Sequence, residues 1–173
     1  MLTLVVGGAL SGKSAYAERL ILRSGAQKHI YLATMEPFGD EAAARIKKHR
    51  AMRRDKGFDT VECYVNLSGL TLPPDSAVLL EDMGNLCANE LFSPQGAGEN
   101  LAEEILRGVA RLRTQCRDLV IVSNEVFTGG REYAGDTERY LSVLSYVNRK
   151  LAAVADAVCE VSAGMATYYK REA

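Results

Sequence analysis

Residues 7–14 combine glycines, a lysine and a serine at a spacing that could hold phosphate groups. They fit the pattern G-x-x-x-x-G-K-[ST]. Glycines let the backbone wrap a phosphate so that several N–H groups point at it. Lys13 can then reach the β- and γ-phosphates, and the Ser14 hydroxyl can bind Mg²⁺. The pattern predicts a nucleoside triphosphate site formed by Gly7, Gly8, Ala9, Leu10, Ser11, Gly12, Lys13 and Ser14.

A site of this kind often has an acidic residue at the end of another buried strand, where it helps to hold Mg²⁺. Glu81 and Asp82 close the apolar run that begins at Val78. Successive residues of a strand point to opposite sides, so only one of the two can face the nucleotide directly. An acidic residue in this position can also simply mark the solvent boundary.

Residues 40–62 read DEAAARIKKHRAMRRDKGFDTVE and contain a predicted basic helix around His49. Arg45, His49 and Arg53 are four residues apart and share one face. Three interpretations compete: a solvated basic helix, a nucleic-acid patch, and a triphosphate clamp around a nucleophilic imidazole. The nucleic-acid patch is disfavoured because aromatic residues are not interleaved and the chain is not basic overall. The residues alone leave the other two open.

The elements that must position these side chains alternate along the chain, which predicts a three-layer α/β domain with a mostly parallel sheet. Apolar runs predict strands, and the stretches between them predict helices. The expected strands are 2–6, 30–34, 78–81, 119–123 and 157–161, with 60–64 a further candidate. The expected helices are 13–24, 40–56, 100–116 and 137–155, and the expected loops are 71–76 and 92–100.

Length and composition predict one domain over residues 1–173 of an ordinary globular protein. A net charge of −1 gives no overall reason to expect nucleic acid or an anionic membrane as a partner. The four cysteines form no CxxC pair, which favours reduced thiols over a zinc site. The first apolar run is too short for a signal peptide or a membrane span. We therefore expect a cytoplasmic protein.

Several motifs together resemble one family, the bifunctional adenosylcobinamide kinase / adenosylcobinamide-phosphate guanylyltransferases of cobalamin biosynthesis. The most specific are R-I-x-x-H-R at 45–50, followed by T-x-E at 60–62 and N-E-V at 124–126. The other matching pieces are GGALSGKS (7–14), YLATM (31–35), LLE (79–81) and VNRKLAAVADAVCEVSAG (147–164). The pieces cover nearly the full chain.

The resemblance implies a transferase with two steps. The γ-phosphate of ATP or GTP passes to adenosylcobinamide, and GMP from GTP then passes through a guanylyl-histidine to give adenosyl-GDP-cobinamide. His49 takes the place of the family nucleophile, and His29 is expected to be structural. Glu81 rather than Asp82 matches the acidic position, which with Ser14 would hold Mg²⁺ through the nucleotide. The other nucleotide-binding positions implied are Ala33, Thr34, Met35, Arg50, Ala51, Met52, Arg53 and Glu62.

The resemblance also implies a RecA-like P-loop NTPase fold and a homotrimer. Segment 127–146 departs from the usual family pattern after N-E-V, so the resemblance implies least about the corrinoid pocket. Three alternative functions stay open at this point. They are a guanylyltransferase without a kinase step, a generic small-molecule P-loop kinase, and a GTP-binding switch.

Overall fold

A computed structural model describes residues 1–36, 47, 50–125 and 134–171 of the chain. Its centre is a seven-stranded sheet with the order β3-β2-β4-β5-β1-β6-β7. All neighbouring strands are parallel except β6 and β7, which are antiparallel. The strands are β1 (Leu2–Gly7), β2 (Lys28–Ala33), β3 (Asp59–Glu62), β4 (Ser76–Glu81), β5 (Asp118–Asn124), β6 (Ala157–Ser162) and β7 (Met165–Arg171).

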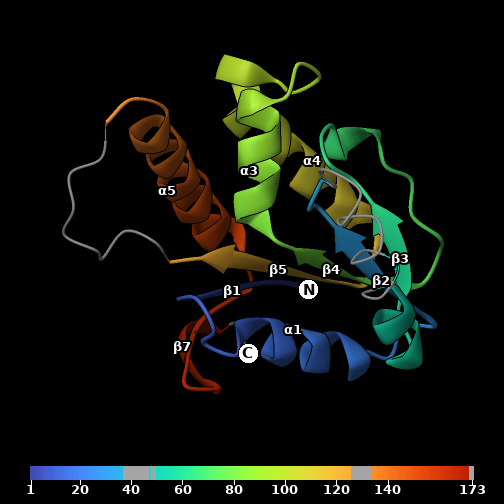
Figure 1. The fold of residues 1–173 in the computed structure, drawn as a ribbon. Helices are drawn as coiled ribbons and strands as arrows, with labels where there is room; N and C mark the ends of the chain where they lie inside the picture. The colour runs from blue at the N-terminus through green and yellow to red at the C-terminus, as the bar shows by residue number, and fades with distance from the viewer. Residues whose placement is uncertain (37–46, 48–49, 126–133, 172–173) are drawn as a thin grey trace.

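Helices cover both faces of this sheet (Figure 1). Helix α1 (Lys13–Leu22) lies on one face, and α3 (Met83–Phe92), α4 (Leu101–Gln115) and α5 (Asp136–Val154) lie on the other. Two short 3-10 helices, η1 (Leu67–Gly69) and η2 (Gly98–Asn100), stand in the connections. Residues 50–55 form a further helical stretch before β3. The expected three-layer α/β arrangement with a mostly parallel sheet is confirmed.

The buried side chains form two apolar clusters, one on each face of the sheet. Strand β4 contributes to both, because Val78 and Leu80 belong to the cluster under α3, α4 and α5, whereas Ala77 and Leu79 belong to the cluster under α1. This alternation is the period of a strand covered on both sides. It explains why the strands read as continuous apolar runs. Most of the predicted site residues lie at or just after the carboxyl ends of strands β1, β2, β3 and β4.

The predicted strands and the helices at 13–24, 100–116 and 137–155 are confirmed, with shifts of one or two residues at most ends. Thr34 was expected inside its strand but follows it, and β3 ends at Glu62 rather than at residue 64. Most of the helix predicted at 40–56 lies outside the described residues. Helix α3 and strand β7 were not predicted.

The four cysteines are free thiols, as expected, and three of them are buried. Among the described residues, no helix combines the length and the apolar character that crossing a membrane requires.

Candidate active site

The phosphate loop predicted at 7–14 connects the end of β1 with the start of α1. The Ser11 N–H donates to the Gly8 carbonyl oxygen at 3.3 Å, which tightens the turn. Gly12 has φ of 90°, and a Cβ at this position would lie 3.1 Å from the Gly164 Cα atom. A side chain here would therefore be strained and would also push the loop away from the β6–β7 turn. Leu10 is fully exposed at the tip of the loop.

Lys13 and Ser11 point their polar atoms into the loop. The Lys13 ammonium is buried and donates to the Gly8 carbonyl oxygen at 3.1 Å. The Ser11 hydroxyl oxygen is buried and has no hydrogen-bond partner among the described residues. Buried polar groups normally have partners, because an unpaired one is costly. The loop thus offers a cation and an unused hydroxyl where the sequence pattern predicts phosphate oxygens.

Glu81 lies directly beside this loop. The Ser14 hydroxyl donates to Glu81 Oε1 at 2.5 Å, whereas Glu81 Oε2 is buried without a partner in the described structure. Burial raises the pKa of Glu81 to about 7, and the charge of Asp82 acts in the same direction. The hydrogen bond from Ser14 and the charge of Lys13 oppose this shift. Glu81 is therefore poised between its protonated and ionised forms at neutral pH.

The Asp82 side chain binds α3 and β5 instead of the phosphate loop. Its Oδ1 accepts from the Asn85 N–H at 2.7 Å and caps the first turn of α3. Its Oδ2 accepts from the Asn124 side-chain amide at 3.2 Å. Of the two acidic residues that the sequence offered, Glu81 contacts the phosphate loop and Asp82 holds α3 and the end of β5.

Ala33 and Thr34 are buried at the end of β2, and Met35, which follows them, is half exposed. The Thr34 hydroxyl donates to the Asp82 carbonyl oxygen at 2.9 Å and accepts from the Asp82 N–H at 2.8 Å. The Asn89 amide adds a bond to the Thr34 carbonyl oxygen at 2.8 Å. These bonds fix the end of β2 to the end of β4, next to Glu81.

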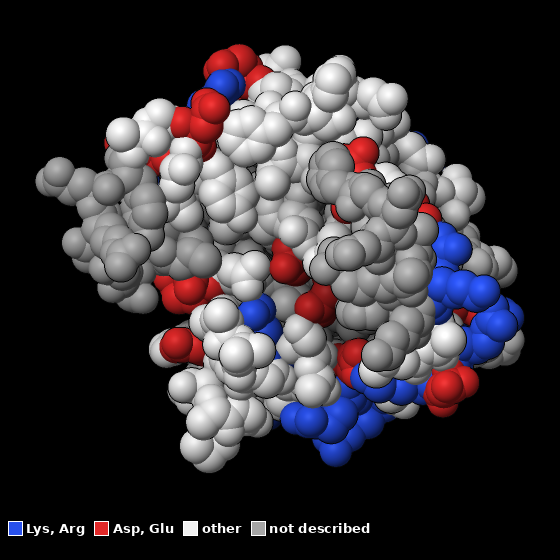
Figure 2. Space-filling model, viewed as in Figure 1, with Lys and Arg blue, Asp and Glu red and all other residues white. Residues whose placement is uncertain are grey.

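A second group of predicted residues lies at the ends of β2 and β3. Arg50 and Glu62 form an ion pair, and the Arg53 guanidinium stacks on the Tyr31 ring at 3.7 Å from its centre. Lys and Arg side chains gather around the helical residues 50–55 in Figure 2. Ala51 and Met52 are exposed on this helical stretch. Arg50 and Arg53 thus each have a partner on the neighbouring strands, Glu62 of β3 and Tyr31 of β2.

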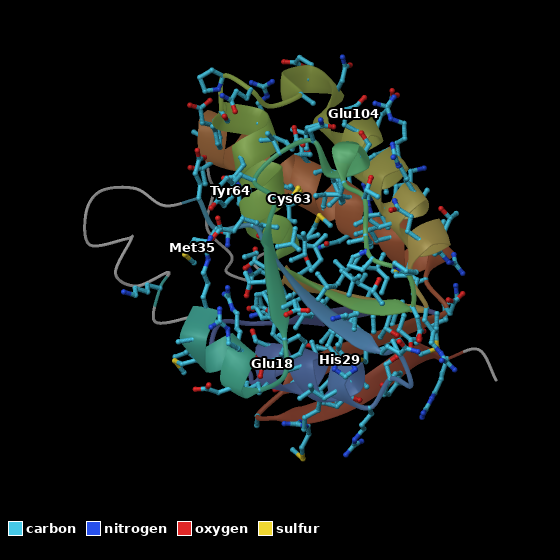
Figure 3. All side chains as sticks on the ribbon, turned by 90° about the vertical axis from the view of Figure 1, so that its right-hand side faces the viewer. Glu18, His29, Met35, Cys63, Tyr64 and Glu104 are labelled. Atoms are coloured by element: carbon cyan, nitrogen blue, oxygen red, sulfur yellow. The ribbon has the colours of Figure 1, made fainter. Side chains whose placement is uncertain are left out.

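A cavity of about 280 Å³ opens beside this second group. Its lining includes Glu36, Glu62, Tyr64 and Asn66. Met35 and Tyr64 lie near each other on this side of the molecule in Figure 3. Carboxylates and backbone groups around a concave space are suited to a polar ring such as a nucleobase.

The predicted residues therefore fall into two groups along one edge of the sheet. The phosphate loop and Glu81 form the first, and residues 33–35, 50–53 and Glu62 form the second. His49 lies outside the described residues and immediately precedes Arg50. His29, the other histidine, is at the opposite end of β2 and packs near the Phe58 ring at 6.2 Å between ring centres.

The structure adds two residues that the sequence analysis did not assign. Asn124 ends β5 and reaches Asp82, and a Cβ placed on Gly84 would lie 2.9 Å from the Tyr140 hydroxyl and 3.2 Å from the Asn124 amide. Asn124 and Tyr140 thus converge beside the Glu81–Asp82 pair. Asn124 opens the N-E-V motif of the family resemblance, to which no role was assigned, and nothing local identified Tyr140.

Comparison with known proteins gives consistent matches over nearly the whole chain. The family model described as "Cobinamide kinase / cobinamide phosphate guanyltransferase" matches residues 3–168. A bifunctional adenosylcobalamin biosynthesis protein CobU from Salmonella typhimurium is 34% identical, over 98% of this chain and 100% of that protein. Its Escherichia coli counterpart is 32% identical with the same coverage. CobP from Pseudomonas aeruginosa, described with the same bifunctional role, is 31% identical over 99% of both chains.

Solved structures give more distant likenesses. The flagellar accessory protein FlaH from Methanocaldococcus jannaschii has a TM-score of 0.47 at 13% identity and covers 99% of this chain and 78% of its own. The P4 protein of bacteriophage phi6, in complex with ADP, has a TM-score of 0.46 at 16% identity, with coverage of 96% and 52%. The assignment rests on the sequence matches, and by these the chain belongs to the cobinamide kinase / cobinamide phosphate guanyltransferase family.

Proposed function

We propose that this chain phosphorylates adenosylcobinamide and then transfers GMP to the product, and that both steps use the phosphate loop at 7–14. The observation that supports this most directly is the contact between Ser14 and Glu81 at the base of that loop. It joins the residue that the motif predicts to bind Mg²⁺ with an acid from another strand. Phosphoryl transfer depends mainly on positioning and charge neutralisation, and this pair together with Lys13 supplies both.

In the kinase step, the hydroxyl of the aminopropanol arm attacks the γ-phosphorus, and the bond to the β–γ bridging oxygen breaks. The nucleoside diphosphate leaves with that bridging oxygen, and the hydroxyl proton is lost. The Lys13 ammonium and the N–H groups of the loop stabilise the charge on the phosphates. The loop and α1 thus hold the donor while its terminal phosphorus stays open to the acceptor.

In the guanylyl step, a nitrogen of the His49 imidazole attacks the α-phosphorus of GTP. Pyrophosphate leaves, and GMP remains bound through a phosphorus–nitrogen bond. A phosphate oxygen of adenosylcobinamide phosphate then attacks the same phosphorus and releases the imidazole. Arg50 and Arg53 stand beside His49 in the chain and would neutralise the charge at the α-phosphate.

The residues present fit a Mg²⁺ ion held jointly with the triphosphate. Ser14 and Glu81 are the side chains that would hold it, and the unpartnered Glu81 Oε2 is the atom that an ion would satisfy. The ion, when bound, neutralises charge on the β- and γ-phosphate oxygens. Within the described ranges, no group of three His, Cys, Asp or Glu side chains could hold a metal by itself.

The proposal extends to the assembly and the compartment. We propose a homotrimer, from the family resemblance, and a cytoplasmic site of action. The free thiols support this proposal, because a reducing compartment keeps cysteines unpaired.

The test uses the purified chain with Mg²⁺ and GTP labelled on either the α- or the γ-phosphate. After denaturation, we expect protein-bound label from the α-labelled nucleotide alone, stable in base and lost in acid. His49→Ala should abolish this label and leave triphosphate binding within about twofold. His29→Gln changes the other histidine and should keep the label, so it is the matched control. Full labelling of His49→Ala would exclude His49 as the nucleophile.

Lys13→Ala is the companion variant. Both steps need the triphosphate in the loop, so we expect losses of about 10²-fold or more in cobinamide phosphorylation and in guanylyl labelling. If the unchanged protein binds GTP but yields neither the label nor phosphorylated cobinamide, it is a nucleotide-dependent switch instead. If the unchanged protein phosphorylates cobinamide but takes up no label from α-labelled GTP, it is a simple kinase.

A further inference from the structure

A cavity of about 660 Å³ lies at the amino end of the sheet, at the opposite end of the strands from the phosphate loop. Its lining comes from the first residues of β1, β5 and β6, from the end of α1 with the two residues that follow it, and from β7. A cavity of this size is in the range that holds a small organic molecule. Neither step of the proposed function uses this amino-edge cavity.

The space arises because the side chains that face α1 become smaller toward the amino end of the sheet. On β6, Cys159 and Val161 belong to the apolar cluster under α1, and Ala157 faces the same way two residues earlier. On β1, Val5 belongs to this cluster and Thr3 precedes it by two residues. Helix α1 (Figure 1) packs chiefly over β4 and β5. The amino ends of β1 and β6 are therefore left less covered on this face.

The part of the lining that belongs to the parallel strands is mostly apolar. Val120 and Ala157 are buried there beside Thr3, which is also buried and supplies a hydroxyl. Leu20 of α1 adds half-buried apolar surface, and Tyr168 adds an aromatic ring from β7. This lining favours a ligand with an apolar body, because removal of apolar surface from water is favourable.

Asp118 is the acidic residue among the described side chains that line the cavity, and its charge is already matched. Its Oδ2 accepts from the Ser24 hydroxyl at 2.5 Å. Its Oδ1 lies 3.5 Å from the N-terminal ammonium of Met1, which also lines the cavity. The carboxylate and the ammonium therefore cancel each other, and the remaining charge of the lining comes from its arginines.

Two guanidinium groups supply this remaining charge. Arg23 follows the end of α1, Arg171 ends β7, and both are exposed at the rim of the cavity. The Arg171 guanidinium lies 4.9 Å from the centre of the Tyr168 ring. Within the described part of the chain, neither arginine forms an ion pair. The rim thus carries two positive charges that an acid group of a ligand could neutralise.

We infer that the amino-edge cavity is a second ligand site, which binds an organic anion with one acid group on an apolar body. Arg23 and Arg171 bind the acid group, because guanidinium groups pair with carboxylate, sulfonate or phosphate oxygens through parallel N–H bonds. The apolar body packs on Val120, Ala157 and the ring of Tyr168. The inference goes beyond the proposed function and does not depend on it.

This ligand is a different molecule from the nucleotide in the phosphate loop. Helix α1 separates the two sites, because Lys13 begins it and Arg23 follows its last residue. Ten helical residues span roughly 15 Å at 1.5 Å per residue. Phosphates held at Lys13 therefore cannot contact Arg23, and both sites can be occupied at once.

The test compares two fluorescent probes that differ in one acid group. They are 8-anilinonaphthalene-1-sulfonate and its uncharged counterpart, N-phenyl-1-naphthylamine. The purified full chain is titrated with each probe in excess MgGDP, so that the phosphate loop is occupied. We expect saturable binding of one sulfonate probe per chain, and binding of the uncharged probe at least about tenfold more weakly, since it lacks the group that the two arginines bind.

Variants locate the probe in the cavity. Arg23→Gln combined with Arg171→Gln should raise the Kd of the sulfonate probe by about tenfold or more and leave that of the uncharged probe within about twofold. Arg19→Gln is the matched control on the same helix, because Arg19 lies over the Tyr16 ring and does not line the cavity. It should shift either Kd by less than about twofold.

Ala157→Leu tests the apolar part of the site. The larger side chain fills space between the sheet and α1, so both probes should bind at least about tenfold more weakly. Urea unfolding checks that this variant is folded. The two arginine changes are on exposed side chains, so they test the site even if Ala157→Leu does not fold.

Three results would overturn the inference. Equal affinity for the two probes would show that the cavity does not recognise an acid group. An unchanged Kd of the sulfonate probe in the double arginine variant would show that Arg23 and Arg171 do not bind it. Loss of binding on addition of MgGDP would show that the probe occupies the phosphate loop instead of the amino-edge cavity.

Discussion

The fold changes the proton affinity of Glu81. It is largely buried, it receives one hydrogen bond from Ser14, and its pKa is raised to about 7. A carboxyl group with a raised pKa in the folded state binds its proton more tightly there than in the unfolded chain. The stability that this proton confers is complete below the ordinary value near 4.5 and is lost as pH rises through 7. The protein without nucleotide therefore loses stability across this interval.

Glu81→Gln tests this directly, because glutamine cannot ionise. We expect the variant to be more stable than the unchanged protein at pH 8 by on the order of 2 kcal/mol, with a much smaller gain at pH 5. The measurement is urea unfolding at both values without nucleotide or Mg²⁺. Glu103→Gln makes the same chemical change on an exposed face of α4 and should give no such gain. An equal gain at both pH values would show that ionisation of Glu81 is not its source.

At this scale, the sequence predicted which residues could bind phosphate but not how each side chain is held. The motif identified Lys13 and Ser14 because their spacing from the glycines is local. The choice between Glu81 and Asp82 came from the family resemblance, since strand alternation does not tell which side faces the loop. The bonds from Asp82 to Asn85 and Asn124 depend on where α3 begins and where β5 ends, which are tertiary facts.

The contact of α4 with the 3-10 helix η1 depends on one glycine inside a helix. Gly108 is buried in α4, and a Cβ there would lie 2.7 Å from the Leu67 Cβ and 3.0 Å from the Ser68 backbone nitrogen. Alanine is favoured over glycine in a helix interior by up to about 1 kcal/mol. An alanine Cβ at this position would be too close to Leu67 and Ser68. These neighbouring atoms cannot easily move away, because they belong to the backbone and to the base of a buried side chain.

We expect Gly108→Ala to lower the free energy of unfolding by about 1–2 kcal/mol, since overpacking outweighs helix propensity here. Gly25→Ala is the matched control, because its added Cβ would meet the Arg117 side chain at an ordinary 3.5 Å. That control should be neutral or slightly stabilising. Chemical unfolding measures both. A stabilised Gly108→Ala would mean that α4 moves away from η1 at little cost.

Helix α3 and strand β7 were not predicted from the sequence, for two different reasons. Helix α3 follows β4 after a single residue, Asp82, and carries Gly84 and two asparagines, which are poor helix formers. Its stability comes from burial of Met83, Leu86 and Cys87 against the sheet. Strand β7 is antiparallel in a sheet that the alternation of strands and helices predicted to be parallel. Its neighbour β6 was predicted, but residues 165–171 show no strict alternation of polar and apolar side chains in the sequence.

At the scale of the whole molecule, we predict that three copies of the chain assemble into a homotrimer. A homotrimer of chains of 18.8 kDa has a mass of about 56 kDa. Light scattering after gel filtration measures the mass. A value near 18.8 kDa at micromolar concentration would reject the trimer.

The place of β1 in the sheet has a consequence for synthesis of the chain. β1 lies between β5 and β6, so its first partner begins at residue 118 of 173 and its second at residue 157. After a ribosome has made this apolar strand, it extends the chain by more than a hundred residues before either neighbour exists. Until then both edges of β1 are open to other chains. β1 therefore waits longer for its first neighbour than any other strand of the sheet, and during that interval its open edges are the part of the chain most exposed to wrong pairing.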